Sequence, residues 1–462
     1  MSGHMARDAT IAERVAPPKG RLSFPELMLR MIGNPVASWG EDFYREPLIL
    51  YRWLGLETVF VMDPALIQRV LLDDAESYSK QPLNDDVFGE AIGGGLLNAE
   101  GEAWRWQRRL TAPLFRAEDV LAYVPAFAAA CAPVLDRWRK SGNGASQAID
   151  RDMTRATLQA LQDTVLGASL SEEDRRSIEE AGATFLAYST WKVALTSLRL
   201  PPWLPHPGAR IMVRTGKQLR DVARRVLAKA RASGAQGEEL LPRLVTARDP
   251  ATGDAMPDSL IVDNVVTFLI AGHETTSQAL TWTLYLLALF PEWQERVREE
   301  VMGVIGEGGD IGREELGKLP LLDAVFQEAM RIYPPAPVLM RRTIAPVTLG
   351  DVELGAGATI TIPIYVVHRH GSLWQDPLRF DPSRFSAEAK ATRHRCAYMP
   401  FGAGPRTCIG GTFAMVEGKT MLATLLAQAR FALPAGEQPT PFARITLRPK
   451  EGLKLNVTML SG

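Results

Sequence analysis

The sequence predicts a mainly α-helical fold with a small β-rich region. Several long segments place apolar residues at the spacings of three and four that are typical of a helix packed on a core. Runs that suggest strands are short and lie beside glycine turns. Of the 462 residues, 46% are hydrophobic and 23% charged, as in a globular protein large enough to enclose a cofactor. No linker or repeat divides the chain, so we expect one domain over 1–462, with 1–21 as a poorly ordered N-terminal segment.

Charge and cysteine content limit the possible functions and locations. Lysine and arginine total 52 and aspartate and glutamate 53, a net charge of −1 that gives no support to nucleic-acid binding. Three scattered cysteines, Cys131, Cys396 and Cys408, indicate a reducing compartment rather than a disulfide framework. Residues 1–21 lack an apolar core, and charged residues interrupt the apolar region 260–290. We therefore expect a soluble, cytoplasmic protein with no membrane anchor.

The chain begins with short elements. Helices are expected over 23–32 and 35–44, followed by a hairpin formed by 48–54 and 57–61. Asp63 suits the N-cap and Pro64 the first position of the next helix. The segment 81–98 resembles a loop. Its three consecutive glycines lack the Gly-Lys-Ser/Thr continuation of a phosphate-binding loop, so flexibility is their expected role.

Long helices should form most of the remaining chain. The apolar spacing predicts helices over 103–111, 118–140, 147–166, 172–198, 208–232, 319–332 and 412–429. Short strands are expected at 348–351 and 359–363, around glycine turns. The segments 446–449 and 453–457 flank a Lys-Glu-Gly turn and should close as a hairpin.

The longest helix lies between turn and capping residues at 254–259 and the helix-breaking Pro291. The polar residues near its centre are costly in an apolar helix unless they are hydrogen-bonded or functional. Thr275 can turn its hydroxyl to the Ala271 carbonyl, which weakens the local ladder and opens a small groove. The residues alone also allow a kinked structural helix with Glu274 in solvent.

A single cysteine lies just before the helix at 412–429, in the segment 401–411. The positive end of that helix lowers the pKa of Cys408 and favours thiolate. Gly404 and Gly410 allow the backbone to approach a flat partner, and Arg406 suits an acidic one. A lone cysteine is usually a buried structural thiol. The whole set instead suits a haem iron ligand.

The spacing Phe-x-x-Gly-x-Arg-x-Cys-x-Gly over 401–410 resembles the haem-binding loop of the cytochrome P-450 family. This resemblance implies that Cys408 is the axial iron ligand and that Arg406 pairs with a propionate of haem b. It also places a further set of residues against the haem: Phe401, Gly402, Gly410 and Ala271.

Two further segments resemble propionate-binding parts of the same family. Trp104 and Arg108 lie four residues apart on one helical face and are similar to its Trp-x-x-x-Arg pair. Arg341 stands where the family often has another propionate partner, and Arg342 is a close competitor. Without the cysteine loop, an exposed arginine resting on a tryptophan would explain the first pair equally well.

The centre of the long helix is similar to the family's Ala-Gly-x-Glu/Asp-Thr segment. By this resemblance Thr275 orients protons near the bound oxygen, and Glu274 relays them from solvent. Both residues favour the reaction R–H + O2 + 2e− + 2H+ → R–OH + H2O. The alternatives are a haem-thiolate peroxygenase and a non-catalytic haem sensor, which would need no proton relay.

A structural network is also implied. The segments 327–331 and 377–385 resemble family motifs, although Ser383 stands where glutamate is more usual. The resemblance implies that Glu328, Arg331 and Arg384 form a charge network that holds the cysteine loop in place.

Substrate and partners are defined only in outline. Apolar residues expected near the pocket indicate an apolar organic substrate of unspecified class: Val87, Phe88, Leu96, Phe268, Ala271, Val338, Leu339 and Phe442. No flavin, nicotinamide or iron–sulfur motif is found, so electrons should come from a ferredoxin or flavodoxin-like partner with its reductase. Basic residues flank the cysteine side and suit either an acidic partner or plain solvation: Arg105, Arg109, Arg393, Arg395 and Lys419.

Overall fold

The computed structural model describes residues 10–11, 15–80, 83–167, 170–201, 203–234, 237–306 and 309–460, with backbone only at 83–86. Much of the segment 1–21, expected to be poorly ordered, therefore lies outside the described residues. Its described part is attached to the rest of the chain: Thr10 forms a β-bridge with Arg379, and the buried Ile11 donates its amide hydrogen to the Leu378 carbonyl. Backbone pairing and burial therefore connect these two residues to the rest of the chain.

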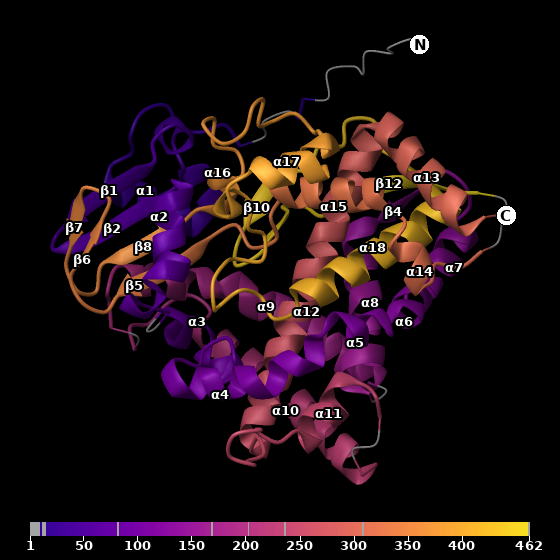
Figure 1. Cartoon of the computed structure of the whole chain (residues 1–462), viewed down its shortest axis with the longest axis horizontal. Coiled ribbons are helices and arrows are strands. Elements are labelled where there is room, and N and C mark those ends of the chain that lie inside the picture. Colours follow the sequence, from indigo (N-terminus) through magenta and orange to yellow (C-terminus); the bar gives the residue numbers. More distant parts are fainter. Residues whose placement is uncertain are drawn as a thin grey trace.

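Helices dominate the fold, as the sequence predicts (Figure 1). Their bounds are α1 Phe24–Gly33, α2 Pro64–Gln68, α3 Leu83–Ile92, α4 Gly101–Thr111, α5 Ala117–Leu121, α6 Val124–Ala129, α7 Ala132–Ser141, α8 Ile149–Leu161, α9 Glu172–Ser197, α10 Ala209–Ala232, α11 Leu240–Thr246, α12 Asp258–Leu289, α13 Pro291–Ile305, α14 Arg313–Leu316, α15 Pro320–Ile332, α16 Ile364–Val367, α17 Ala387–Thr392 and α18 Gly411–Gln428. In the described part of the chain, no helix combines the length and the apolar character needed to cross a membrane.

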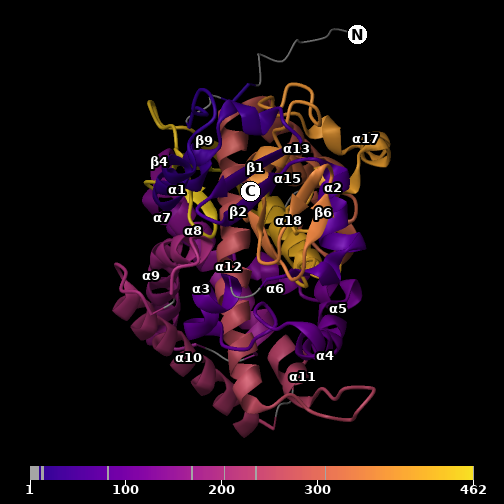
Figure 2. The ribbon, with the colours of Figure 1, turned by 90° about the vertical axis from the view of Figure 1, so that its left-hand side faces the viewer.

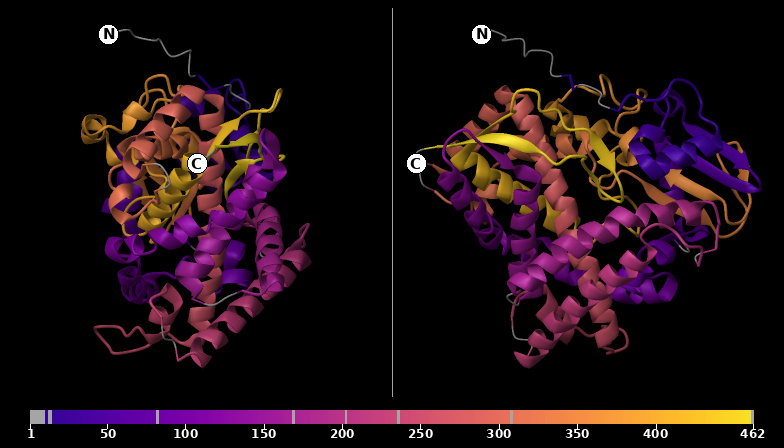
Figure 3. Two further views of the ribbon diagram at one scale, coloured as in Figure 1. Left: turned by 90° about the vertical axis from the view of Figure 1, so that its right-hand side faces the viewer. Right: turned by 180° about the vertical axis from the view of Figure 1, so that it is seen from behind.

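The strands are short and form small sheets. Their bounds are β1 Leu48–Trp53, β2 Leu56–Val61, β3 Tyr78–Ser79, β4 Ala145–Ala148, β5 Leu339–Thr343, β6 Val347–Leu349, β7 Val352–Leu354, β8 Thr359–Ile362, β9 Ala429–Ala432, β10 Pro441–Ala443, β11 Leu447–Pro449 and β12 Lys454–Met459. The largest sheet has the order β1-β2-β8-β5-β3, and a second has the order β4-β12-β9. These two sheets lie on opposite sides of the helices (Figures 1 and 3).

Helix α12 is the centre of the molecule. It runs through the middle of the turned view, with other helices on either side (Figure 2), and packs against α8, α10, α15 and α18. Most of its 32 residues are buried, as expected for a helix enclosed by protein. Trp282 stacks on Tyr333 of the segment after α15, with ring centroids 4.0 Å apart.

The segment predicted as a flexible loop, 81–98, instead contains α3, and its glycines pack closely against α12. The Gly94 amide donates to Asp263 Oδ2 at 2.9 Å. A Cβ added at Gly93 would lie 2.5 Å from that same carboxylate oxygen, and one at Gly95 would lie 2.9 Å from the Asp263 carbonyl. These glycines serve close packing rather than flexibility.

Two other predictions, one helix and one hairpin, differ from the structure. The predicted helix 118–140 is divided into α5, α6 and α7, and Pro125 and Pro133 lie in the first turns of α6 and α7. The predicted closing hairpin does not form: β11 pairs with β10, and β12 lies between β4 and β9. A turn at 450–452 does separate the two strands, but β11 pairs with the strand just before it, and β12 pairs with β9 and with the distant β4.

Candidate functional site

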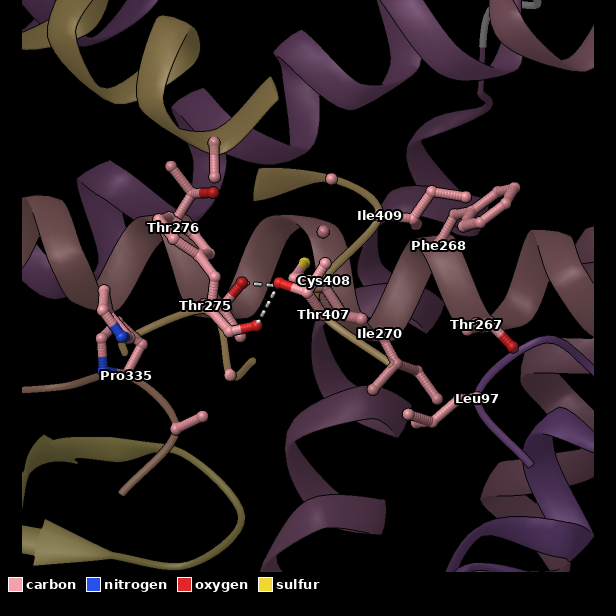
Figure 4. A pocket seen from close by; sticks show the side chains of 18 of the residues that line it. Leu97, Thr267, Phe268, Ile270, Thr275, Thr276, Pro335, Thr407, Cys408 and Ile409 are labelled. Atoms are coloured by element: carbon pink, nitrogen blue, oxygen red, sulfur yellow. Dashed lines mark hydrogen bonds between the residues drawn. The ribbon is translucent and has the colours of Figure 1, made fainter. Parts of the chain in front are cut away.

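A mostly apolar cavity of about 390 Å³ lies between α12 and the loop that precedes α18. Cys408 of that loop and Thr275 of α12 both line it (Figure 4). Further wall residues come from α3, α4, β5 and the segment before β11. Two motifs that are 133 positions apart in the sequence, at 275 and 408, therefore meet in one internal space.

Backbone hydrogen bonds hold the cysteine loop. The Cys408 amide donates to the Phe401 carbonyl at 2.9 Å, and the Gly402 amide donates to Met399 at 3.0 Å. Gly404 has φ +76°, and a Cβ there would lie 1.9 Å from the Leu71 carbonyl oxygen. Gly404 therefore allows close approach to the segment before β3, and the expectation that it faces a flat partner is wrong. Gly402 and Gly410 do line the cavity, as does Phe401.

The Cys408 side chain is exposed, although the loop lies inside the protein, because it faces the cavity. The thiol is open only to this internal cavity and is otherwise surrounded by protein; that burial raises its pKa, whereas the Gly410 amide hydrogen bond and the charge of Arg108 lower it. Helix α18 begins three residues later, so its positive end also favours thiolate. A metal cation at the sulfur would deprotonate it.

Among the described residues, four cationic side chains line the same cavity: Lys80, Arg108, Arg341 and Arg406. Burial is the main cause that lowers the pKa of Lys80 to about 7, and repulsion from Arg341 and Arg406 adds to it. Burial and the charge of Arg406 lower the pKa of Arg341 to about 10. Glu100 is the carboxylate that opposes this repulsion, and it is already hydrogen-bonded to Ser79 Oγ at 2.6 Å. The cluster is thus arranged to receive a further anion.

Contacts distinguish the predicted members of this cluster. The Arg406 guanidinium lies 4.1 Å from the centroid of the Trp104 ring and donates to the Ala99 carbonyl at 2.6 Å. The motif from α4 and the cysteine motif therefore touch. Arg341 lines the cavity, whereas Arg342 does not line it and donates to the Thr196 carbonyl at 3.1 Å. Lys80 was missed, because an isolated lysine after a two-residue strand carries no motif.

The centre of α12 presents adjacent residues to different spaces. Thr275 Oγ1 donates to the Ala271 carbonyl at 2.7 Å, as expected from the sequence, and both residues line the cavity. Glu274 does not line it. Its carboxylate accepts a hydrogen bond from Thr446 Oγ1 at 3.1 Å and faces a second, polar cavity. Successive residues of a helix point about 100° apart, which explains the difference.

The structure places some of the expected pocket residues in the cavity wall and others elsewhere. Phe88, Leu96, Phe268, Ala271 and Leu339 line the cavity. Val87, Val338 and Phe442 do not line it.

Each of the three has an identifiable alternative environment. Val87 is buried on another side of α3 from Phe88, one residue away on the helix. Val338 packs on the hydrophobic core. The Phe442 ring lies 4.7 Å from the Arg444 guanidinium in the β10–β11 region.

Glu328 and Arg331 of α15 form a fully buried, bidentate ion pair, with N–O distances of 2.6 and 2.8 Å. Arg331 also donates to the carbonyls of His368 and Pro377. The Asp381 amide donates to Glu328 at 2.9 Å, whereas Arg384 approaches it only to 3.6 Å. The network ties α15 to the segment 368–381, which precedes the cysteine loop.

These features fit a haem. The sulfur of Cys408 suits an iron, the cation cluster suits two carboxylates, and apolar walls with small residues at 271, 402 and 410 suit a flat ring.

Comparisons with known proteins agree with this fit. The family model for cytochrome P-450 matches residues 33–457. Cytochrome P-450 4B1 of Rattus norvegicus is 31% identical, with 96% of this chain and 90% of that protein covered. Cytokinin hydroxylase of Arabidopsis thaliana is 32% identical, with 91% and 82% covered. The crystal structure of the cytochrome P-450DA heme domain matches with a TM-score of 0.79 at 22% identity, covering 97% of this chain and 98% of that one, which shows the shared fold.

Proposed function

The chain belongs to the cytochrome P-450 family, and from this premise we propose that it is a single haem domain that inserts one oxygen atom of O2 into an apolar organic molecule. The family consists of haem-thiolate monooxygenases, which act on organic substrates with O2 and redox partners. The observation that carries the proposal is the meeting of Cys408, Thr275 and the cation cluster in one apolar cavity.

In this proposal the chain holds haem b at three places. Cys408 Sγ would ligate the iron, and Phe401, Gly402, Gly410 and Ala271 would hold the ring. The cationic side chains of the cavity would bind the propionates, together with the Trp104 indole: Lys80, Arg108, Arg341 and Arg406. When bound, the haem supplies an iron that activates O2, and its thiolate ligand favours O–O cleavage.

The side chains of α12 then handle protons. Thr275 donates its hydroxyl hydrogen to the Ala271 carbonyl. The lone pairs of its oxygen can therefore accept a hydrogen bond from a group inside the cavity. Glu274, the residue before Thr275, has its carboxylate outside the cavity wall. We assign Thr275 to orienting a proton donor and Glu274 to supplying the proton. Apolar residues from α3, α12 and β5 exclude bulk water and contact the substrate.

We further propose a cytoplasmic location and a separate ferredoxin or flavodoxin-like electron donor with its reductase. Most of the basic residues expected to attract that donor already have partners. Arg105 pairs with Glu102, Arg109 with Asp249 and Lys419 with Asp323, while Arg393 stacks on aromatic rings. Arg395 is exposed and donates to Gln68. The attraction for an acidic donor is therefore weaker than a simple count of basic residues suggests.

The proposal is tested by comparing two oxidant systems on a substrate found by spectral titration of the haem-loaded protein. With O2 and a reduced ferredoxin or flavodoxin, the wild type should form product in proportion to electrons consumed. Thr275→Ala should divert most of the electrons to hydrogen peroxide, because proton delivery is then misdirected. Thr281→Ala, a buried threonine of α12 that does not line the cavity, serves as the control for coupling. Turnover with hydrogen peroxide but not with O2 and a reduced donor would favour a peroxygenase. Unchanged coupling in Thr275→Ala would show that the role assigned to Thr275 is wrong.

A second prediction concerns the pH dependence of haem binding. Before an anion binds, Lys80 has a pKa of about 7, and a propionate beside it should raise that pKa. Below pH 7 Lys80 is charged both in the haem-free and in the haem-bound protein. Above pH 7 Lys80 must take up a proton when haem binds, so the affinity for haem should fall as pH rises, by at most about tenfold per pH unit.

Haem titrations of the apoprotein between pH 6.5 and 9.5 measure this slope. Lys80→Gln should flatten it, whereas Lys318→Gln, on an exposed side chain, should not. A wild-type affinity that is independent of pH would contradict a propionate contact at Lys80.

A further inference from the structure

A second cavity, of about 570 Å³, lies on the other side of α12 and is lined mainly by polar side chains. Its walls come from α8, α9, α12 and β11. Arg151, Arg155 and Glu180 at its rim are exposed, whereas Glu274 and Gln278 at its floor are buried. The cavity is therefore a polar passage from the surface to the central helix.

The floor of this passage contains an unsatisfied polar group. Gln278 Oε1 is buried and has no hydrogen-bond partner among the described residues. Gln278 lies four residues after Glu274, so both side chains lie on the same face of α12. A buried amide oxygen without a partner is costly, and a polar cavity of this size has room for water to satisfy it.

A hydrogen bond connects the walls of the two cavities. Thr446, just before β11, lines the apolar cavity that contains Cys408, called the haem cavity below, and its hydroxyl donates to Glu274 Oε1 at 3.1 Å. Glu274 lines the polar cavity and is only 9% exposed. Both residues are buried, so this hydrogen bond lies at the boundary between the two spaces.

We propose that Thr446 is a positioning residue: its hydroxyl keeps the Glu274 carboxylate at the boundary between the haem cavity and the polar cavity, whose water is the source of the protons that the proposed function assigns to Glu274. Each proton that Glu274 releases towards the haem cavity is replaced on its carboxylate from this water, so solvent supplies both protons of each turnover. This inference rests on the proposed function, since reduction of O2 is what consumes protons.

The main test uses haem-loaded protein with O2 and a reduced donor. Thr446→Val keeps the side-chain shape but removes the donor, and should lower product formed per electron pair several-fold and raise the solvent deuterium isotope effect on turnover. Thr446→Ser keeps the hydroxyl and should restore both. The carbon-monoxide difference spectrum should be the same in all three proteins. Thr446→Val with wild-type coupling and isotope effect would overturn the role of Thr446.

The polar cavity is tested separately. Ala183 is an exposed wall residue of α9, and Ala183→Trp should obstruct the passage and raise the isotope effect. Ala228→Trp, at an exposed site of α10 away from both cavities, is the matched control. A high-resolution crystal structure should show ordered water between the rim and Glu274. A dry cavity, or an Ala183→Trp variant identical to the control, would overturn the proposal.

The two levels of proposal fail differently. If the wild type forms no product with O2 and any reduced donor, the proposed function fails. If the wild type is well coupled and the Thr446 and Ala183 variants behave like it, only the proton passage fails.

Discussion

Replacing Cys408 with serine is expected to abolish monooxygenation, with turnover reduced by at least about 10³-fold, or about 4 kcal/mol in the activation barrier. A serine hydroxyl in this place is a harder and far less basic electron donor than thiolate, so it cannot favour O–O cleavage in the same way. The cations and apolar walls of the cavity are unchanged by this substitution. Haem content should therefore fall less than activity does.

The measurement is a carbon-monoxide difference spectrum of the reduced protein, together with product formation. Cys408→Ser should lose the band typical of a thiolate ligand. Cys396→Ser makes the same atomic change at a buried thiol outside the cavity and should keep the band. Retention of the thiolate band in Cys408→Ser would show that another residue ligates the iron and would remove the basis of the site.

Replacing Glu328 with alanine is expected to destabilise the fold by about 3–5 kcal/mol, because it leaves the buried Arg331 charge without its carboxylate. A typical domain has only about 5–15 kcal/mol of stability in total. Arg331 also holds the carbonyls of His368, Pro377 and Arg379. Its displacement would release the segment that precedes the cysteine loop, so haem should be lost along with stability.

Denaturant unfolding and haem content of the purified variant measure this effect. Glu299→Ala, at an exposed position of α13, should change stability by no more than about 0.5 kcal/mol. Arg384→Ala should lower the free energy of unfolding less than Glu328→Ala does. Arg384 lies 3.6 Å from the Glu328 carboxylate, which keeps its bidentate pair with Arg331 when Arg384 is removed. A stable, haem-loaded Glu328→Ala protein would contradict the structural role assigned to the network.

Local patterns in the sequence were sufficient for the elements whose determinants lie within one segment. The hairpin of β1 and β2, the N-cap at Asp63 and the long helix α12 occur where the sequence predicts them. Asp63 accepts hydrogen bonds from the amides of Ala65 and Leu66, both within three residues. The segment 81–98 was misjudged because the closeness of its glycines to Asp263 depends on a helix about 170 residues later.

The sequence by itself determined the family, the helical fold class and the candidate sulfur ligand, because a motif such as 401–410 has its residue types and spacing within one loop. Only the tertiary structure decided that Lys80 joins the cation cluster, that Arg341 rather than Arg342 faces the cavity, and that Thr446 reaches Glu274. These residues lie on separate elements with no motif of their own. Their proximity results from packing around α12, and burial and electrostatic repulsion act on them only once the chain is folded.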